Sequence, residues 1–174
     1  MDRTGLKDTL EYFFSPPDNL APGILDAICD LVAAGGSVSM TFVRFNLERA
    51  FLIGYVKDGD VIIACSSLKH PRPEFLATVR EQAGIDLVNY LERGYTSVKP
   101  EYRKRGIGSA LLAGLTARIG DRKLFSVIGE DNIGGHKIAL NNRTKRVAVY
   151  QSKTSGKKLG IWIPEWMLGD GIDP

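Results

Sequence analysis

A basic turn with two glycines, set between a predicted strand and a predicted helix, constrains the fold of this chain more than any other feature. The turn reads Arg-Lys-Arg-Gly-Ile-Gly at 103–108; it follows a strand-like stretch at 95–98 and precedes apolar residues at helical spacing. Glycines at the start of a helix let the first backbone N–H groups approach an anion, and the helix dipole adds about half a positive charge. The sequence therefore predicts an anion-binding turn.

Two common nucleotide-binding motifs do not fit this turn. The dinucleotide pattern GxGxxG would need a glycine at position 111, where the chain has Leu111. A Walker P-loop would need Gly-Lys followed by Ser or Thr after a longer loop, and the turn has neither. The alternative that the residues leave open is a plain glycine turn with a solvated basic flank.

The rest of the chain predicts an α+β fold. Helices are expected over 22–34, 71–83 and 107–119, a short helix or turn over 4–14, and a polar helix or loop over 132–142. Strands are expected over 39–45, 50–56, 61–67, 95–98, 124–128, 146–151 and 158–163. An Asp-Gly turn joins the second and third of these as an antiparallel hairpin. We therefore expect a mixed, mostly antiparallel central sheet flanked by helices.

Length and hydropathy bound the class of protein. A chain of 174 residues, 44% hydrophobic and 25% charged, is expected to form a single domain over residues 1–174. Its apolar runs are far shorter than the ~20 residues of a membrane span, and charged residues stand where an export signal would need an apolar segment. The sequence therefore predicts a cytoplasmic protein without a membrane partner.

The cysteines, histidines and net charge point away from a metal and from nucleic acid. Cys29 and Cys65 belong to no metal-spaced cluster and are expected to be buried thiols. His70 and His136 each lack a second ligand at metal spacing. The net charge of +3 is too small to indicate a nucleic-acid binder. A solvated rim is the simpler interpretation of the basic cluster Arg143, Lys145, Arg146, Lys153, Lys157 and Lys158.

Around the basic turn the sequence resembles the GCN5-related N-acetyltransferase (GNAT) family. The pattern Arg-x-x-Gly-x-Gly at 103–108, after the strand at 94–98 and before the helix that opens at 109–112, resembles the family's acetyl-CoA-binding motif. The resemblance extends over about residues 89–163. It implies a GNAT-like acyl-CoA N-acyltransferase fold with acetyl-CoA as co-substrate and without a metal.

The resemblance also implies which residues hold the co-substrate. The pantetheine arm would hydrogen-bond backbone groups near the end of the predicted strand, and an asparagine after the next strand would contact the same arm. The pyrophosphate would meet the N–H groups of the basic turn. The residues implied in this way are Thr96, Ser97, Val98, Arg103, Lys104, Arg105, Gly106, Ile107, Gly108, Ser109 and Asn132.

Glu92 is the candidate general base. An amine with a pKa near 10.4 is neutral in only about one molecule in 2,500 at pH 7, so a base must take its proton before attack. Glu92, six residues before Val98, resembles the place where histone-acetyltransferase-type members carry this glutamate. The alternative is a surface glutamate paired with Arg93. Weaker candidates for the base are Glu74, Glu81, Asp86 and His70.

The general acid is less clear, because this chain departs from the family pattern. Family members frequently carry a tyrosine at the position of Ala139, where it protonates the leaving thiolate, and Gly-Phe at the positions of Arg143 and Thr144. Tyr150 and Tyr95 are candidate substitutes for that acid. The alternative for both is an aromatic side chain that packs in the core with its hydroxyl hydrogen-bonded.

The predicted function is transfer of acetyl from acetyl-CoA to a primary amine by direct attack in a ternary complex. The alternatives are a non-catalytic CoA or acyl-CoA sensor and a nucleic-acid-associated protein on the same scaffold. The acceptor is expected to be a small-molecule or peptide amine. The sequence leaves the acceptor's identity, the acyl chain length and the oligomeric state open, a homodimer included.

Two segments are expected to lie outside the common core of such a fold. Residues 70–88 interrupt what is usually a direct connection between strands in the family, and this helical insertion is expected to form a wall or lid at the acceptor end of the cleft. Residues 165–174 are expected to form a tail.

Overall fold

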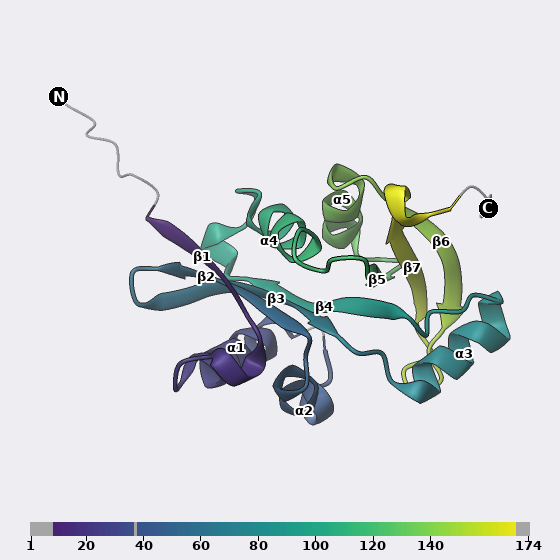
Figure 1. Cartoon of the computed structure of the whole chain (residues 1–174), viewed down its shortest axis with the longest axis horizontal. Helices are drawn as coiled ribbons and strands as arrows, with labels where there is room; N and C mark the ends of the chain where they lie inside the picture. Colours follow the sequence, from purple (N-terminus) through teal and green to yellow (C-terminus); the bar gives the residue numbers. More distant parts are fainter. Residues whose placement is uncertain (1–8, 37, 170–174) are drawn as a thin grey trace.

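The computed structural model describes residues 9–36 and 38–169, which form a seven-stranded sheet with helices on both faces (Figure 1). The strands are β1 (Leu10–Ser15), β2 (Leu52–Asp58), β3 (Val61–Lys69), β4 (Tyr90–Val98), β5 (Lys123–Gly129), β6 (Thr144–Gln151) and β7 (Lys158–Pro164). They lie in the order β1-β2-β3-β4-β5-β7-β6, and β4 and β5 are the parallel pair among these described neighbours. The predicted mixed, mostly antiparallel α+β sheet is confirmed.

Helices α1 and α2 cover one face of the sheet, α4 and α5 cover the other, and α3 lies at the far end beside β6 (Figure 1). The α-helices are α1 (Ile24–Gly35), α2 (Val43–Glu48), α3 (Pro73–Ala83), α4 (Ile107–Thr116) and α5 (Ile133–Asn141). Short 3-10 turns lie at Pro17–Asn19, Met40–Phe42, Pro100–Tyr102 and Glu165–Met167. Both α1 and α3 stop at a left-handed glycine, Gly36 and Gly84, as their sequences predict.

The prediction of a strand over 39–45 is wrong, because this segment is helical. Val43 and Leu47, four residues apart, are fully buried in a cluster with α1, while Phe42 and Phe45 are exposed. Burial therefore follows the helical period, which the run of β-branched and aromatic residues conceals in the sequence.

The helix or turn expected over 4–14 is also wrong over its described part. Residues 10–15 form β1, an edge strand antiparallel to β2, and residues 4–8 lie outside the described residues. Phe13 stacks on Tyr55 on one face of the sheet, at a ring distance of 5.0 Å. Phe14 packs in the cores of the other face. Both adjacent phenylalanines are partly buried, on opposite faces, because a strand alternates its side chains between faces.

The main core joins α3 and the C-terminal turn to the sheet. Val79 and Leu87, from the predicted insertion, are fully buried in this core, and Phe75 stacks on Phe125 at 5.5 Å. Met167 is buried there too, and its Sδ accepts a hydrogen bond from the Leu124 N–H at 3.3 Å. Helix α3 of this segment is therefore packed on the sheet, and Met167 docks the turn at Glu165–Met167 against the same core.

The cysteines differ in how deeply they are buried. Cys65 is fully buried on β3, and burial raises the pKa of its thiol to about 12. Cys29 is half-buried on α1, and burial, with the charges of Asp30 and Glu48, raises its pKa as well. Both thiols therefore stay protonated at neutral pH. The burial of Cys65 agrees with its predicted structural role, whereas Cys29 is less buried than expected.

Gly114 offers a test of how β1 docks on α4. The Phe14 ring lies against Gly114 of α4 and Gly54 of β2, and a Cβ at position 114 would overlap the ring. We expect Gly114→Ala to destabilise the fold by about 1–3 kcal/mol, although alanine is the better helix former. Urea denaturation of Gly114→Ala, Phe14→Ala and the double variant measures this. Phe14→Ala should relieve the overlap, so the double variant should lose less stability than the sum of the two single variants. A loss equal to that sum would contradict the contact between Phe14 and Gly114.

Candidate active site

β4 and β5 separate halfway along their length. They pair over Tyr90–Arg93 and Lys123–Ser126, and beyond these residues β4 pairs with β3 while β5 pairs with β7. Within the described sheet, the facing edges of the two strands therefore present backbone N–H and C=O groups that no strand takes up. An extended ligand placed in this split could hydrogen-bond to these backbone groups as an additional strand would.

A β-bulge at Tyr95 accompanies the split. The register between β3 and β4 shifts between Cys65 and Ser67, and Tyr95 has a φ of 54°, which is rare for a bulky residue. Two hydrogen bonds fix this conformation: Asn46 Nδ2 donates to the Tyr95 hydroxyl at 2.7 Å, and Cys65 Sγ donates to the Tyr95 carbonyl at 3.3 Å. The bulge therefore lies where β4 separates from β5, and these two hydrogen bonds hold it in place.

A cleft of about 970 Å³ lies where the end of β4, the basic turn, α1 and the start of α5 meet. The predicted co-substrate residues that line this cleft are Thr96, Ser97, Val98, Arg103 and Asn132. The structure thus brings together residues from both sides of the split that the sequence separates by more than thirty positions. Asp30, Asp60 and Glu101 also line it, so the cleft is not purely basic.

The basic turn has the backbone of an anion site. Gly106 precedes α4 with a φ of 76°, and within the described chain no side chain caps this helix end. Arg103 Nε donates to the Val98 carbonyl at 3.1 Å, which ties the turn to the end of β4. Ile107 is buried in the core and Lys104 has a left-handed φ of 62°. The first N–H groups of α4 are therefore left for a ligand or water.

The start of α5 lines the cleft, although the sequence did not single it out, whereas the predicted co-substrate residues 104–109 are not among the residues that line it. Gly134 and Gly135, in the first turn of α5, line the cleft with Ile138. Asn132 caps this helix, because its Oδ1 accepts the Gly135 N–H at 3.0 Å. A Cβ at Gly135 would lie 2.8 Å from Ile128 Cγ2 and 2.9 Å from Asn132 Nδ2, so only glycine fits there. The signal in the sequence is the pair of glycines two residues after a capping asparagine.

Glu92 lies on β4 before the split and forms an ion pair with Lys69. The distance from Lys69 Nζ to Glu92 Oε1 is 3.3 Å, and the two side chains are only 11% and 20% exposed. Lys69 Nζ also lies 4.0 Å from the centre of the Tyr95 ring. The alternative partner expected from the sequence, Arg93, is wrong, because Arg93 is buried and contacts Gly108 instead. Glu92 is not among the residues that line the cleft.

Tyr150 is buried on β6 and is also not among the residues that line the cleft. Its ring meets Phe75 edge-on at 5.6 Å, and burial, with the charge of Glu92, raises the pKa of its hydroxyl. Ala139 on α5 is likewise buried, in a small cluster with Ile128 and Trp162. The structure thus places Tyr150 within electrostatic reach of Glu92 and away from the lining of the cleft.

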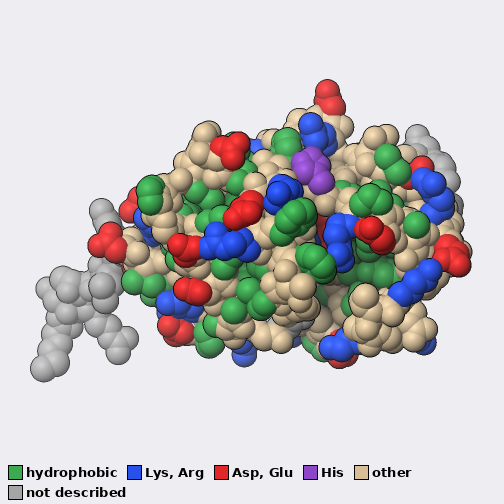
Figure 2. Space-filling view, turned by 90° about the horizontal axis from the view of Figure 1, so that it is seen from below, with side chains coloured by type: hydrophobic (Ala, Val, Ile, Leu, Met, Phe, Trp, Pro, Cys, Tyr) green, Lys and Arg blue, Asp and Glu red, His purple; other side chains and the backbone are tan. Residues whose placement is uncertain are grey.

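Half of the six residues of the predicted basic rim are paired with nearby acids. Arg143, Arg146 and Lys153 form ion pairs with Glu165, Glu130 and Glu81 respectively. On the face that carries α1 and α2, acidic and basic side chains are interspersed with apolar ones (Figure 2). Charge on these surfaces is therefore mixed, which does not favour a nucleic-acid interface.

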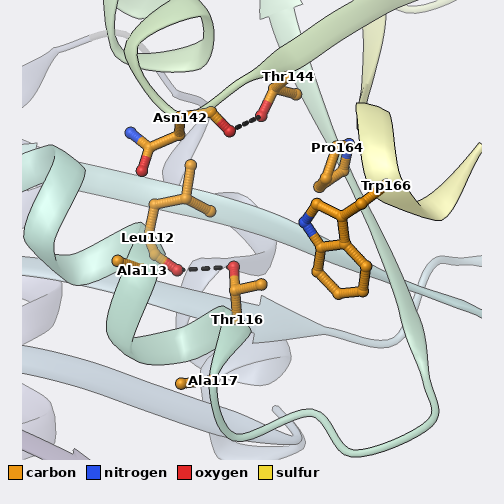
Figure 3. A pocket seen from close by; sticks show the side chains of 8 residues that line it. All are labelled: Leu112, Ala113, Thr116, Ala117, Asn142, Thr144, Pro164 and Trp166. Carbon is orange, nitrogen blue, oxygen red and sulfur yellow. Dashed lines mark hydrogen bonds between the residues drawn. The ribbon is translucent and has the colours of Figure 1, made fainter.

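A second pocket, of about 410 Å³, lies between α4 and the start of the 3-10 turn at Glu165–Met167 (Figure 3). It shares no lining residue with the cleft. The two threonine hydroxyls in it are taken up locally: Thr116 donates to the Leu112 carbonyl and Thr144 to the Asn142 carbonyl. With its polar groups bonded within their own segments, this pocket offers little to fix a polar substrate, and we place the candidate site in the larger cleft.

Two searches of the described residues bear on metal ions and membranes. Residues 9–36 and 38–169 contain no group of three His, Cys, Asp or Glu side chains arranged to hold a metal ion. In the same residues, no helix has the length and apolar character needed to cross a bilayer.

Comparison with known proteins gives matches in structure only. No protein-family model and no curated protein sequence matches the chain. A structure described as an acetyltransferase of the GNAT family from Desulfovibrio desulfuricans is similar with a TM-score of 0.66 and 14% identity, over 88% of this chain and 96% of that one. The ribosomal-protein-S18-alanine N-acetyltransferase from Escherichia coli gives 0.62 and 15%, over 94% and 100%.

A third similar structure is of a complex. It is the diaminobutyrate acetyltransferase from Paenibacillus lautus with L-2,4-diaminobutyric acid and coenzyme A, at a TM-score of 0.61 and 14% identity, over 91% of this chain and 96% of that one. At identities this low, the similarity establishes a shared fold.

Proposed function

We propose that this chain, which has the fold of the GNAT acetyltransferases, transfers acetyl from acetyl-CoA to a primary amine. The observation that carries the proposal is the split between β4 and β5, which opens into a cleft lined by the glycine-rich start of α5 and by Arg103 of the basic turn that leads into the start of α4. A split of this kind suits an extended arm with amide groups, and the helix starts suit the pyrophosphate of the same molecule. Coenzyme A has both parts.

In the proposed reaction the amine nitrogen attacks the thioester carbon, the C–S bond breaks, and CoA leaves as a thiol. Backbone N–H groups on the free edge of β4 would polarise the thioester carbonyl. Glu92 would accept the amine proton directly or through a water, and the ion pair with Lys69 would hold its carboxylate in place. Tyr150 is the proposed acid; its raised pKa keeps the hydroxyl protonated at neutral pH and at the same time makes it a weaker proton donor to the thiolate than an ordinary tyrosine.

The second candidate function is a CoA or acyl-CoA sensor that does no chemistry. Two observations favour it: neither Glu92 nor Tyr150 lines the cleft, and Glu92 is engaged by Lys69. Release of free thiol from acetyl-CoA in the presence of a panel of primary amines separates the two functions. An enzyme releases thiol only when its acceptor is present, and a sensor releases none with any amine.

Binding of acetyl-CoA is the first test of the proposal. At about 100 times its dissociation constant, a ligand that binds only the folded state adds roughly 2.7 kcal/mol to the free energy of unfolding. We expect acetyl-CoA and CoA to raise the melting temperature accordingly, measured by differential scanning fluorimetry and calorimetry. Adenosine at the same concentration is the control. A melting temperature that acetyl-CoA leaves unchanged would contradict both the enzyme and the sensor.

A further inference from the structure

Arg93 is a buried arginine without a carboxylate partner. Its side chain is on β4, and the residue is 7% exposed. Its Nη2 donates to the Gly108 carbonyl at a long 3.4 Å, and its Nε has no hydrogen-bond partner. Among the ion pairs of the described residues, none includes Arg93. A charge buried in this way calls for a physical reason.

The position of Arg93 ties it to the cleft. Arg93 and Ser126 are the last residues that pair across β4 and β5 before the strands separate. Its guanidinium reaches across to the first turn of α4, at Gly108, which directly follows the basic turn. A Cβ on Gly108 would lie 3.0 Å from Ile138, a residue that lines the cleft. Arg93 therefore lies between the end of the β4–β5 pairing and the start of α4, which packs against the cleft-lining Ile138.

Burying the Arg93 charge without a carboxylate partner is energetically unfavourable. Burial lowers the pKa of Arg93 to about 10, because the interior disfavours the charged form. An apolar side chain at this position would avoid that penalty and pack against the same neighbours. Near a binding site, an unfavourable buried charge is typical of a residue whose cost is offset when a ligand of opposite charge binds.

We propose that Arg93 is a positioning residue that strengthens the hold of the α4 start on the diphosphate of the ligand. The guanidinium fixes the Gly108 carbonyl and, through it, the direction of the first N–H groups of α4. Its positive charge acts on the diphosphate through the protein interior, where screening by salt is weak. This inference rests on the proposed function, because it takes the ligand to be CoA or acetyl-CoA.

The test compares Arg93→Met, Arg93→Lys and a matched control, Arg118→Met. Arg118 also bonds a carbonyl of α4, with its Nη1 2.8 Å from the Gly114 oxygen, but it is exposed and lies at the other end of the helix. Calorimetric titration with CoA should show an affinity about tenfold weaker in Arg93→Met, and affinities within threefold of the parent in Arg93→Lys and Arg118→Met. The unliganded Arg93→Met protein should melt no lower than the parent. Should Arg93→Met not fold, Arg93→Gln replaces it, with the same loss expected.

Two further probes separate this role from a merely structural one. Inorganic pyrophosphate should compete with CoA about tenfold less well in Arg93→Met than in the parent, whereas pantetheine, which has no phosphate, should compete equally in both. Equal CoA affinity in Arg93→Met and the parent would overturn the inference, and so would an equal loss of pyrophosphate and pantetheine binding. A parent protein that binds no CoA would instead overturn the proposed function, and the inference with it.

Discussion

Replacing Glu92 with glutamine should lower turnover by roughly 10² to 10⁴ while acetyl-CoA still binds, because glutamine keeps the shape of the side chain but cannot accept a proton. Turnover is measured as the initial rate of thiol release with a saturating amine. The shift in melting temperature with acetyl-CoA shows that the variant is folded and its cleft intact. Glu81→Gln is the matched control, since Glu81 also pairs with a lysine, Lys153, at 2.9 Å, but on the exposed side of α3.

The pH profile of Glu92→Gln adds a second expectation. The rate of the variant should recover in part as the pH rises toward the pKa of the acceptor amine, near 10.4, because the solvent then supplies the neutral amine. Wild-type turnover at neutral pH with an unchanged profile would leave Glu92 as the structural partner of Lys69. The base would then have to be another group or an ordered water.

Local patterns predicted those parts of the fold that local interactions decide. The Asp-Gly turn gave the hairpin of β2 and β3, and glycines placed the ends of α1 and α3. The basic turn and its helix also lie where the sequence places them. In each case the signal is a backbone requirement of one or two residues, which does not depend on distant contacts.

The errors arise where distant contacts decide the structure. Residues 39–45 have strand-like composition, yet Val43 packs against α1 at helical spacing. β1 forms because β2 offers it an edge, which no pattern within residues 4–14 reveals. For the same reason the alternative interpretation of Glu92 paired it with its neighbour Arg93. Alternation along β4 points these two side chains to opposite faces, and the true partner, Lys69, comes from the adjacent strand.

The backbone features of the proposed co-substrate site are easier to find in a sequence than the placement of the proposed acid and base. An anion site formed by backbone N–H groups needs glycines, and the sequence has glycines at 106, 108, 134 and 135. The placement of an acid or a base depends on which side chains the sheet brings together. Tyr150 illustrates this, because it approaches Glu92 closely enough to feel its charge although the strands β4 and β6 are not neighbours.

Gly108→Val should abolish the stabilisation by acetyl-CoA, which in the parent is about 2.7 kcal/mol at 100 times the dissociation constant. A Cβ at Gly108 would already lie 3.0 Å from Ile138 Cδ1, and the two methyl groups of valine reach further. They would push α4 away from α5 or drive Ile138 into the cleft that it lines. The first change separates the helix starts that the diphosphate is proposed to bridge, and the second fills part of the cleft. The measurement is the melting temperature with and without acetyl-CoA.

Two controls make the Gly108 result specific. Gly169→Val adds the same side chain where no atom lies within 4 Å of the new Cβ, so its ligand-induced shift should match the parent. Gly108→Ala should fall between the two, because one methyl group at 3.0 Å from a flexible Ile138 end can be accommodated by a small displacement. A folded Gly108→Val protein that acetyl-CoA stabilises as much as the parent would contradict the proposed diphosphate site. Binding of the diphosphate would then not depend on the close approach of α4 and α5.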